Sequence, residues 1–116
     1  MSGDIRAAIF VKRLRPLIGT NLLRFRPRNQ LKTTEFLLDN DLQESDLLEM
    51  VSALTADHYA DGPSEERDGR YPPGQIMVFY YHWEGIRLYI KIKLLQDGSI
   101  EVADILSAHP EGMHDE

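Results

Sequence analysis

The chain of 116 residues contains no cysteine. This absence excludes disulfide bonds, thiolate metal sites and cysteine nucleophiles, and it agrees with a reducing compartment. Long apolar runs are also missing, because no segment approaches the roughly 18 apolar residues that a membrane-spanning helix needs. The N-terminus shows no apolar stretch followed by a small-residue cleavage site, so no secretory signal is predicted. We therefore expect one cytoplasmic domain without a membrane partner.

The common signatures of catalytic and cofactor sites are absent as well. The sequence contains no P-loop, GxGxxG, HExxH, nucleophile-elbow or EF-hand motif. Its four histidines lack a ligand-like spacing (His58, His82, His109 and His114). We expect His114 to be a solvent-exposed residue of the tail. No metal or organic cofactor is predicted, so any chemistry must come from the side chains themselves.

Positive charge is scarce over most of the chain. Residues 33–116 contain 5 Lys/Arg against 18 Asp/Glu, whereas residues 1–32 contain 8 Lys/Arg against one acidic residue. The net charge of −6 argues against non-specific nucleic-acid binding, but the asymmetry leaves a local basic patch open. On charge alone, a solvated basic face beside an acidic exterior is the simpler interpretation.

Residues 87–94 are the most informative segment against this acidic background. Apolar residues at the even positions alternate with four polar ones, Arg87, Tyr89, Lys91 and Lys93. Successive side chains of a strand point to opposite faces, so one face is apolar and the other carries three cations and a phenol. Three of the five cations of residues 33–116 lie here, which suggests a site for an anion such as phosphate.

The rest of the chain predicts helices followed by strands. Helical periodicity indicates helices over residues 5–14, 30–39 and 44–54. Between the first two, Arg24, Arg26 and Arg28 alternate with apolar residues, and they suit either phosphate contacts or a solvated connector. Residues 60–74, rich in Gly, Pro and charge, predict a surface loop. Strands over residues 75–83, 86–95 and 100–106 complete an α+β fold, with N-terminal helices packed on a three-stranded or slightly larger antiparallel β-meander.

Strand register brings further polar side chains to the cationic face. A two-residue loop at Glu84-Gly85 pairs Tyr80 with Tyr89 and His82 with Arg87. A two-residue second loop pairs Lys91 with Asp104 in a cross-strand ion pair. Metal-independent RNA cleavage needs a base for the 2′-OH, an acid for the leaving oxygen and cations for the phosphate, and Tyr, His and Lys can supply them. From the pattern alone, solvated side chains on a strand remain the simpler interpretation.

Several motifs together resemble a known family. They are Phe25 with Arg28-Asn29, the break at residues 39–42 before helix 44–54, residues 54–59 followed by Gly62-Pro63, Val78-Phe79 leading to Gly85, the strand segment Tyr89-Ile90-Lys91-Ile92, and Ser107 with His109. Over about residues 25–110, the chain resembles the MqsR-like toxins of bacterial type II toxin–antitoxin systems, in the RelE/ParE superfamily.

The resemblance implies a RelE/ParE-like fold and an mRNA interferase, an endoribonuclease that cleaves RNA without a metal, on or off the ribosome, and is held inactive by a cognate antitoxin. It implies that Tyr89 takes part in the chemistry and that Lys91 is the strand lysine of the motif. We expect His82 or His109 as a second acid–base group. The expected RNA phosphate contacts are Arg87, Lys93, Arg24, Arg26 and Arg28.

This interpretation divides the chain into a basic N-terminal extension with a short helix (1–24), a toxin-like domain (25–110) and an acidic tail (111–116). An alternative is a non-enzymatic binding module that keeps the fold and acts through protein contacts. The net acidity favours it, and so does Ala60, where some relatives carry a catalytic lysine. A third interpretation is ParE-like action on DNA gyrase.

Overall fold

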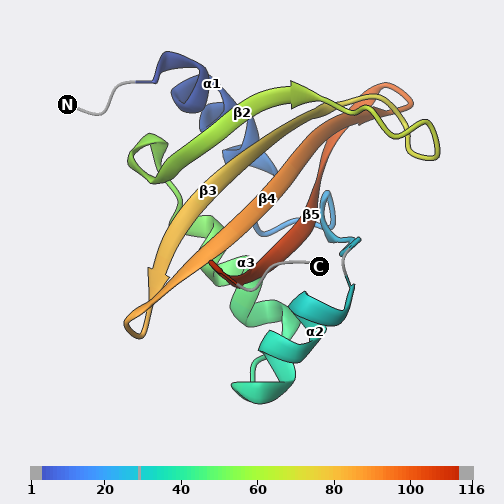
Figure 1. Cartoon of the computed structure of the whole chain (residues 1–116). Coiled ribbons are helices and arrows are strands. Elements are labelled where there is room, and N and C mark those ends of the chain that lie inside the picture. The colour runs from blue at the N-terminus through green and yellow to red at the C-terminus, as the bar shows by residue number, and fades with distance from the viewer. Residues whose placement is uncertain (1–3, 29, 113–116) are drawn as a thin grey trace.

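The computed structural model describes residues 4–28 and 30–112, which form three helices and one five-stranded sheet (Figure 1). The helical elements are α1 (Ile5–Leu14), η1 (Arg15–Leu17), α2 (Gln30–Asp39), α3 (Glu44–Ser52) and η2 (Ala56–His58). The strands are β1 (Leu23–Phe25), β2 (Tyr59–Glu65), β3 (Gln75–Trp83), β4 (Ile86–Asp97) and β5 (Ile100–Pro110). His114 and the predicted acidic tail, apart from Glu111 and Gly112, lie outside the described residues.

The sheet has the strand order β1-β5-β4-β3-β2, and all neighbours are antiparallel except β1 and β5, which are parallel. The α+β class is therefore confirmed, but the described sheet has two strands more than the predicted meander. The three helices lie on one face of the sheet (Figure 1). We call the other face, which carries no described helix, the open face. None of the described helices is long and apolar enough to cross a membrane.

Helix α1 forms over the predicted residues because its ends are capped and one side is apolar. The Asp4 side chain accepts a hydrogen bond from the Arg6 backbone N–H at 2.9 Å, and Lys12 and Arg13 lie in the last turn, where the helix dipole favours cations. Its buried residues follow a spacing of three and four: Ala7, Phe10, Val11 and Leu14. The basic N-terminal segment thus contributes to the same hydrophobic core as the sheet.

Helices α2 and α3 also occupy the predicted positions, although α3 ends two residues early, at Ser52. A capping box begins α3, in which the Gln43 backbone N–H donates to Asp46 at 2.8 Å. Phe36 of α2 is buried and meets Trp83 of β3 edge-on, with ring centroids 5.7 Å apart. These contacts close the core over the inner face of the sheet.

The expectation of a surface loop over residues 60–74 is wrong for its first part, because Tyr59–Glu65 form the edge strand β2. An edge strand tolerates the glycine and proline that argued against a strand here, and β2 pairs with β3 through register shifts. Gly62 has a φ of +100°, and a Cβ there would lie 2.7 Å from the Ile76 carbonyl oxygen. Only glycine fits this close approach.

The β3–β4 register is the predicted one, with Tyr80 opposite Tyr89 and His82 opposite Arg87. The predicted β4–β5 register is wrong. Asp97 still belongs to β4 and pairs with Ile100, so Gly98-Ser99 forms the loop and Asp104 lies opposite Lys93. The predicted pairing of Lys91 with Asp104 is therefore not formed.

A bulge changes the register again in the second half of β5, which extends to Pro110. Lys91 pairs with Ser107 and Ile92 pairs with Ile105, so the intervening Leu106 has no counterpart on β4. Such a bulge shifts by one residue the alternation of side chains between the two faces of the sheet. This shift determines which β5 side chains reach the open face.

Candidate functional site

Three ring-bearing side chains form an aromatic row across β3, β4 and β5 on the open face: Tyr80, Tyr89 and His109. The ring centroids of Tyr80 and Tyr89 are 6.4 Å apart, and those of Tyr89 and His109 are 5.4 Å apart with an interplanar angle of 19°. Directly opposed ring pairs at these distances attract each other. Strand side chains stand roughly perpendicular to the sheet, so the rings project from the open face. The two tyrosines are half-buried there, and His109 is 8% exposed.

The bulge in β5 accounts for the position of His109. Without it, the alternation that starts at Asp104 would bring residue 108 to the open face and turn residue 109 toward the core. Instead, Ala108 is 1% exposed and its N–H donates to the Thr33 hydroxyl at 3.2 Å. Ser107 and His109 consequently share the open face with Lys91 and Tyr89. Bulges are common beside active sites, where they redirect a side chain.

Lys91 is the cation closest to the centre of the row. Its Nζ lies 5.9 Å from the centroid of the Tyr89 ring. Asp104, its predicted partner, instead pairs with Arg24 at 2.7 Å. The described residues place no carboxylate within ion-pair distance of Lys91. Its positive charge is therefore directed at the row and the solvent.

Arg87 and His82 occupy the exposed end of the same face. The Arg87 guanidinium lies 4.2 Å from the centroid of the Tyr80 ring and donates to both carboxylate oxygens of Glu111, at 2.8 and 2.7 Å. This bidentate pair offsets much of the Arg87 charge. His82 is exposed, lies opposite Arg87 and is two residues beyond Tyr80 on β3.

The environment of the row assigns protons to two of its members. Burial raises the pKa of Tyr89, and the Asp61 carboxylate raises it further, so the phenol is protonated at neutral pH and can donate. The His109 Nδ1 lies 3.0 Å from the Pro110 carbonyl oxygen. A carbonyl only accepts, so Nδ1 carries the proton in this contact.

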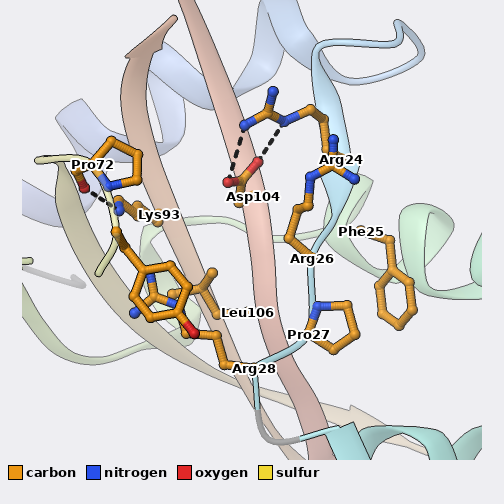
Figure 2. Close-up of a pocket in the computed structure, with 10 residues that line it drawn as sticks. Arg24, Phe25, Arg26, Pro27, Arg28, Pro72, Lys93, Asp104 and Leu106 are labelled. Carbon is orange, nitrogen blue, oxygen red and sulfur yellow. Dashed lines mark hydrogen bonds and ion pairs between the residues drawn. The ribbon is translucent and has the colours of Figure 1, made fainter. Parts of the chain in front are cut away.

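The remaining predicted cations line a basic groove of about 500 Å³ farther along the open face (Figure 2). Arg24, Arg26 and Arg28 lie on β1 and its continuation, where the backbone N–H groups of Arg26 and Arg28 donate to carbonyls of β5 at 3.0 Å. Lys93 and Asp104 come from β4 and β5. The β2–β3 connection forms the opposite wall with Tyr71 and Pro72.

Three of these four cations already have carboxylate partners. Arg24 donates to Asp104 at 2.7 and 3.2 Å (Figure 2), and Arg28 donates to Glu66 at 3.1 and 2.5 Å. The Lys93 Nζ lies 2.7 Å from Glu66 and 2.5 Å from the Pro72 carbonyl oxygen. The Lys93 side chain is 1% exposed, so its geometry supports an anchoring role beneath the β2–β3 connection.

Arg26 differs from its neighbours. It is exposed, and no carboxylate within the described part of the chain pairs with it. Figure 2 shows its side chain beside that of Arg24, on the side of the segment that faces Asp104.

Sequence reasoning found most of these residues but missed their grouping. The predicted pairing of Tyr80 with Tyr89 placed two of the three rings side by side. The contact of Tyr89 with His109 depends on the bulge in β5, which no sequence pattern indicated. Glu66 and Tyr71 were missed because no local pattern indicates that their segment lies over β4. No three His, Asp or Glu side chains among residues 4–28 and 30–112 gather as metal ligands would.

Comparisons with known proteins do not extend this description. A scan against protein-family models, a search of curated proteins and a search of solved structures each found no match to the chain.

Proposed function

We propose that the protein is the toxin of a type II toxin–antitoxin pair, an endoribonuclease that cleaves mRNA in the cytoplasm without a metal. The observation that carries this proposal is the aromatic row with Lys91 beside it. Aromatic side chains on an open sheet are a common platform for single-stranded RNA, because bases stack on the rings while cations contact the backbone.

The row also contains the groups that RNA cleavage requires. In the proposed reaction the His109 imidazole accepts the proton of the 2′-OH, and the resulting oxygen attacks the neighbouring phosphorus. The protonated Tyr89 phenol donates to the departing 5′ oxygen, and Lys91 stabilises the negative charge that grows on the phosphate. The raised pKa of Tyr89 suits a donor rather than a base, which is why we assign the base to His109.

The likeness in residues to MqsR-like toxins supports the remaining parts of the proposal. On that basis we propose a RelE/ParE-like kinship for the helix-and-sheet arrangement, and a cognate antitoxin that holds the protein inactive. A small antitoxin reading frame next to the gene would support this assignment, whereas an isolated gene would weaken it.

The test compares purified wild-type protein with the Tyr89→Phe and Lys91→Ala variants on a single-stranded RNA. Tyr89→Phe should lower the cleavage rate by about 100-fold or more, because it removes the donor and keeps the ring. Tyr81→Phe is the matched control, since Tyr81 pairs with Leu88 on the core side of the sheet. Expression of the wild-type protein without a partner should arrest growth, and the Tyr89→Phe and Lys91→Ala variants should relieve this arrest. Wild-type activity in Tyr89→Phe would overturn the assignment of Tyr89.

A second candidate function is favoured by the charge pairing on this face. Arg24, Arg28, Arg87 and Lys93 all have carboxylate partners, which leaves few cations for RNA. A binding module that acts through protein contacts would need no such cations. Purified protein that leaves RNA intact at low salt, together with harmless expression, would favour this function over cleavage.

A further inference from the structure

The basic groove has an excess of positive charge that is concentrated on one side chain. Its cations are Arg24, Arg26, Arg28 and Lys93, and the carboxylates that contact them are Asp97, Asp104 and Glu66. The ion pairs hold three of the cations in place. Arg26 remains, with its guanidinium beside the Arg24 side chain (Figure 2). An exposed arginine next to another cation, without a carboxylate of its own, is suited to bind an anion.

The groove and the aromatic row share the strands β4 and β5. Tyr89 and Lys93 are four residues apart on β4, and Asp104 and His109 are the corresponding residues on β5. At a rise of about 3.3 Å per residue, the row and the groove are separated by about 13 Å along the strand. Lys91 and Ser107 lie between them. A single RNA strand of a few nucleotides spans this distance along the open face.

We propose that the basic groove binds a backbone phosphate of the RNA, a few nucleotides from the bond that is cleaved at the row, with Arg26 as its ligand. This inference rests on the proposed function and adds a second contact point for the same substrate. Arginine suits this role because its planar fork matches two phosphate oxygens, and such a contact positions the strand without reading its bases. Arg24 and Arg28, fixed by Asp104 and Glu66, form the walls.

The variant Arg26→Gln tests the proposal because Arg26 is exposed and its loss should leave the fold intact. Affinity for an eight-nucleotide, non-cleavable 2′-deoxy strand and cleavage of the matching RNA are measured beside cleavage of a dinucleotide. The variant should bind the long strand several-fold more weakly, and the salt dependence should decrease by about 0.7 in log–log slope for the lost phosphate contact. Cleavage of the dinucleotide, which reaches only the row, should stay unchanged.

Arg70→Gln is the matched control. It removes the same charge from the β2–β3 connection, where Arg70 pairs with Asp68 outside the groove. Equal losses in the two variants, or an equal loss on the dinucleotide, would overturn the phosphate site while leaving the proposed cleavage intact. If the wild-type protein cleaves neither RNA, the proposed function is wrong. The affinities of the wild type and Arg26→Gln for the deoxy strand then still test whether Arg26 binds a backbone phosphate. Inorganic phosphate that binds at Arg26 as tightly as the long strand would assign the groove to a free anion and overturn the RNA assignment.

Discussion

The buried carboxylate of Glu66 offers the sharpest test of what holds the open face together. Its side chain is 4% exposed and accepts hydrogen bonds from Arg28 and Lys93, and from the Asp68 backbone N–H at 3.1 Å. The substitution Glu66→Gln keeps the size of the side chain and removes its charge. It leaves the Lys93 ammonium, which is 1% exposed, without a carboxylate partner.

The Glu66 ion pairs stabilise the folded state by an amount that follows from the pKa of Glu66 and from the burial of Lys93. Hydrogen bonds from Arg28 and Lys93 lower the pKa of Glu66 from 4.5 to about 2. At about 1.4 kcal/mol per pKa unit, this difference corresponds to about 3 kcal/mol of stabilisation of the folded state at neutral pH. Removing one partner of a buried ion pair typically costs about 3–5 kcal/mol, because a buried charge is left uncompensated. Glu66→Gln should therefore lower the free energy of unfolding by about 3 kcal/mol.

The assay is urea denaturation at pH 7, followed by circular dichroism. Asp68→Asn serves as control, because the Asp68–Arg70 pair is exposed and should shift the midpoint little. Adding Lys93→Met to Glu66→Gln should restore part of the lost stability, since the unpaired charge is then absent. A loss below about 1 kcal/mol for Glu66→Gln, or strictly additive effects in the double variant, would show that Lys93 does not depend on Glu66 for its buried position.

Three further predictions concern Glu66, Gly74 and Glu111. The Glu66 contribution is fully present above the unfolded pKa of 4.5 and is lost as the pH falls toward about 2. The free energy of unfolding should therefore fall less between about pH 5 and pH 2 in Glu66→Gln than in the wild type, with the lowered pKa values of Asp4 and Asp68 accounting for what remains. Gly74→Ala should destabilise by about 1–3 kcal/mol in urea, since overpacking strains its neighbours. A Cβ at Gly74 would lie 2.6 Å from a β4 carbonyl oxygen, whereas Gly69→Ala, the control, meets nothing within 4 Å. Glu111→Gln should release Arg87 and tighten binding to the non-cleavable strand at low salt, and unchanged affinity would contradict the compensation of Arg87 by Glu111.

The elements that sequence reasoning found correctly are those with local causes. The helices are specified by an apolar stripe and by caps within a few residues, as at Asp4 and in the Gln43–Asp46 capping box. The first hairpin is specified by Glu84 and Gly85, both of which have positive φ, 51° and 77°. Its register therefore followed from the turn.

The two outer strands had no such local cause. β1 is three residues long and pairs in parallel with β5, whose paired residues are 80 positions later in the chain. β2 contains residues typical of loops, and it is a strand because the edge of β3 offers it partners. The ion pairs of Glu66 depend on these pairings, because they bring the β2–β3 connection over Lys93.

Alternation along a strand is a local property, so the residue pattern alone gives β4 one apolar face and one face with Tyr89, Lys91 and Lys93. The partners of those side chains depend on how β4 is paired with its neighbouring strands. A single unpaired residue in β5 reverses the alternation beyond Ile105, and that reversal brings His109 to Tyr89. In this strand register Asp104 forms an ion pair with Arg24, and Lys91 lies beside the aromatic row. Strand register is a non-local property with a period of two, so one residue of slip changes the composition of the whole face.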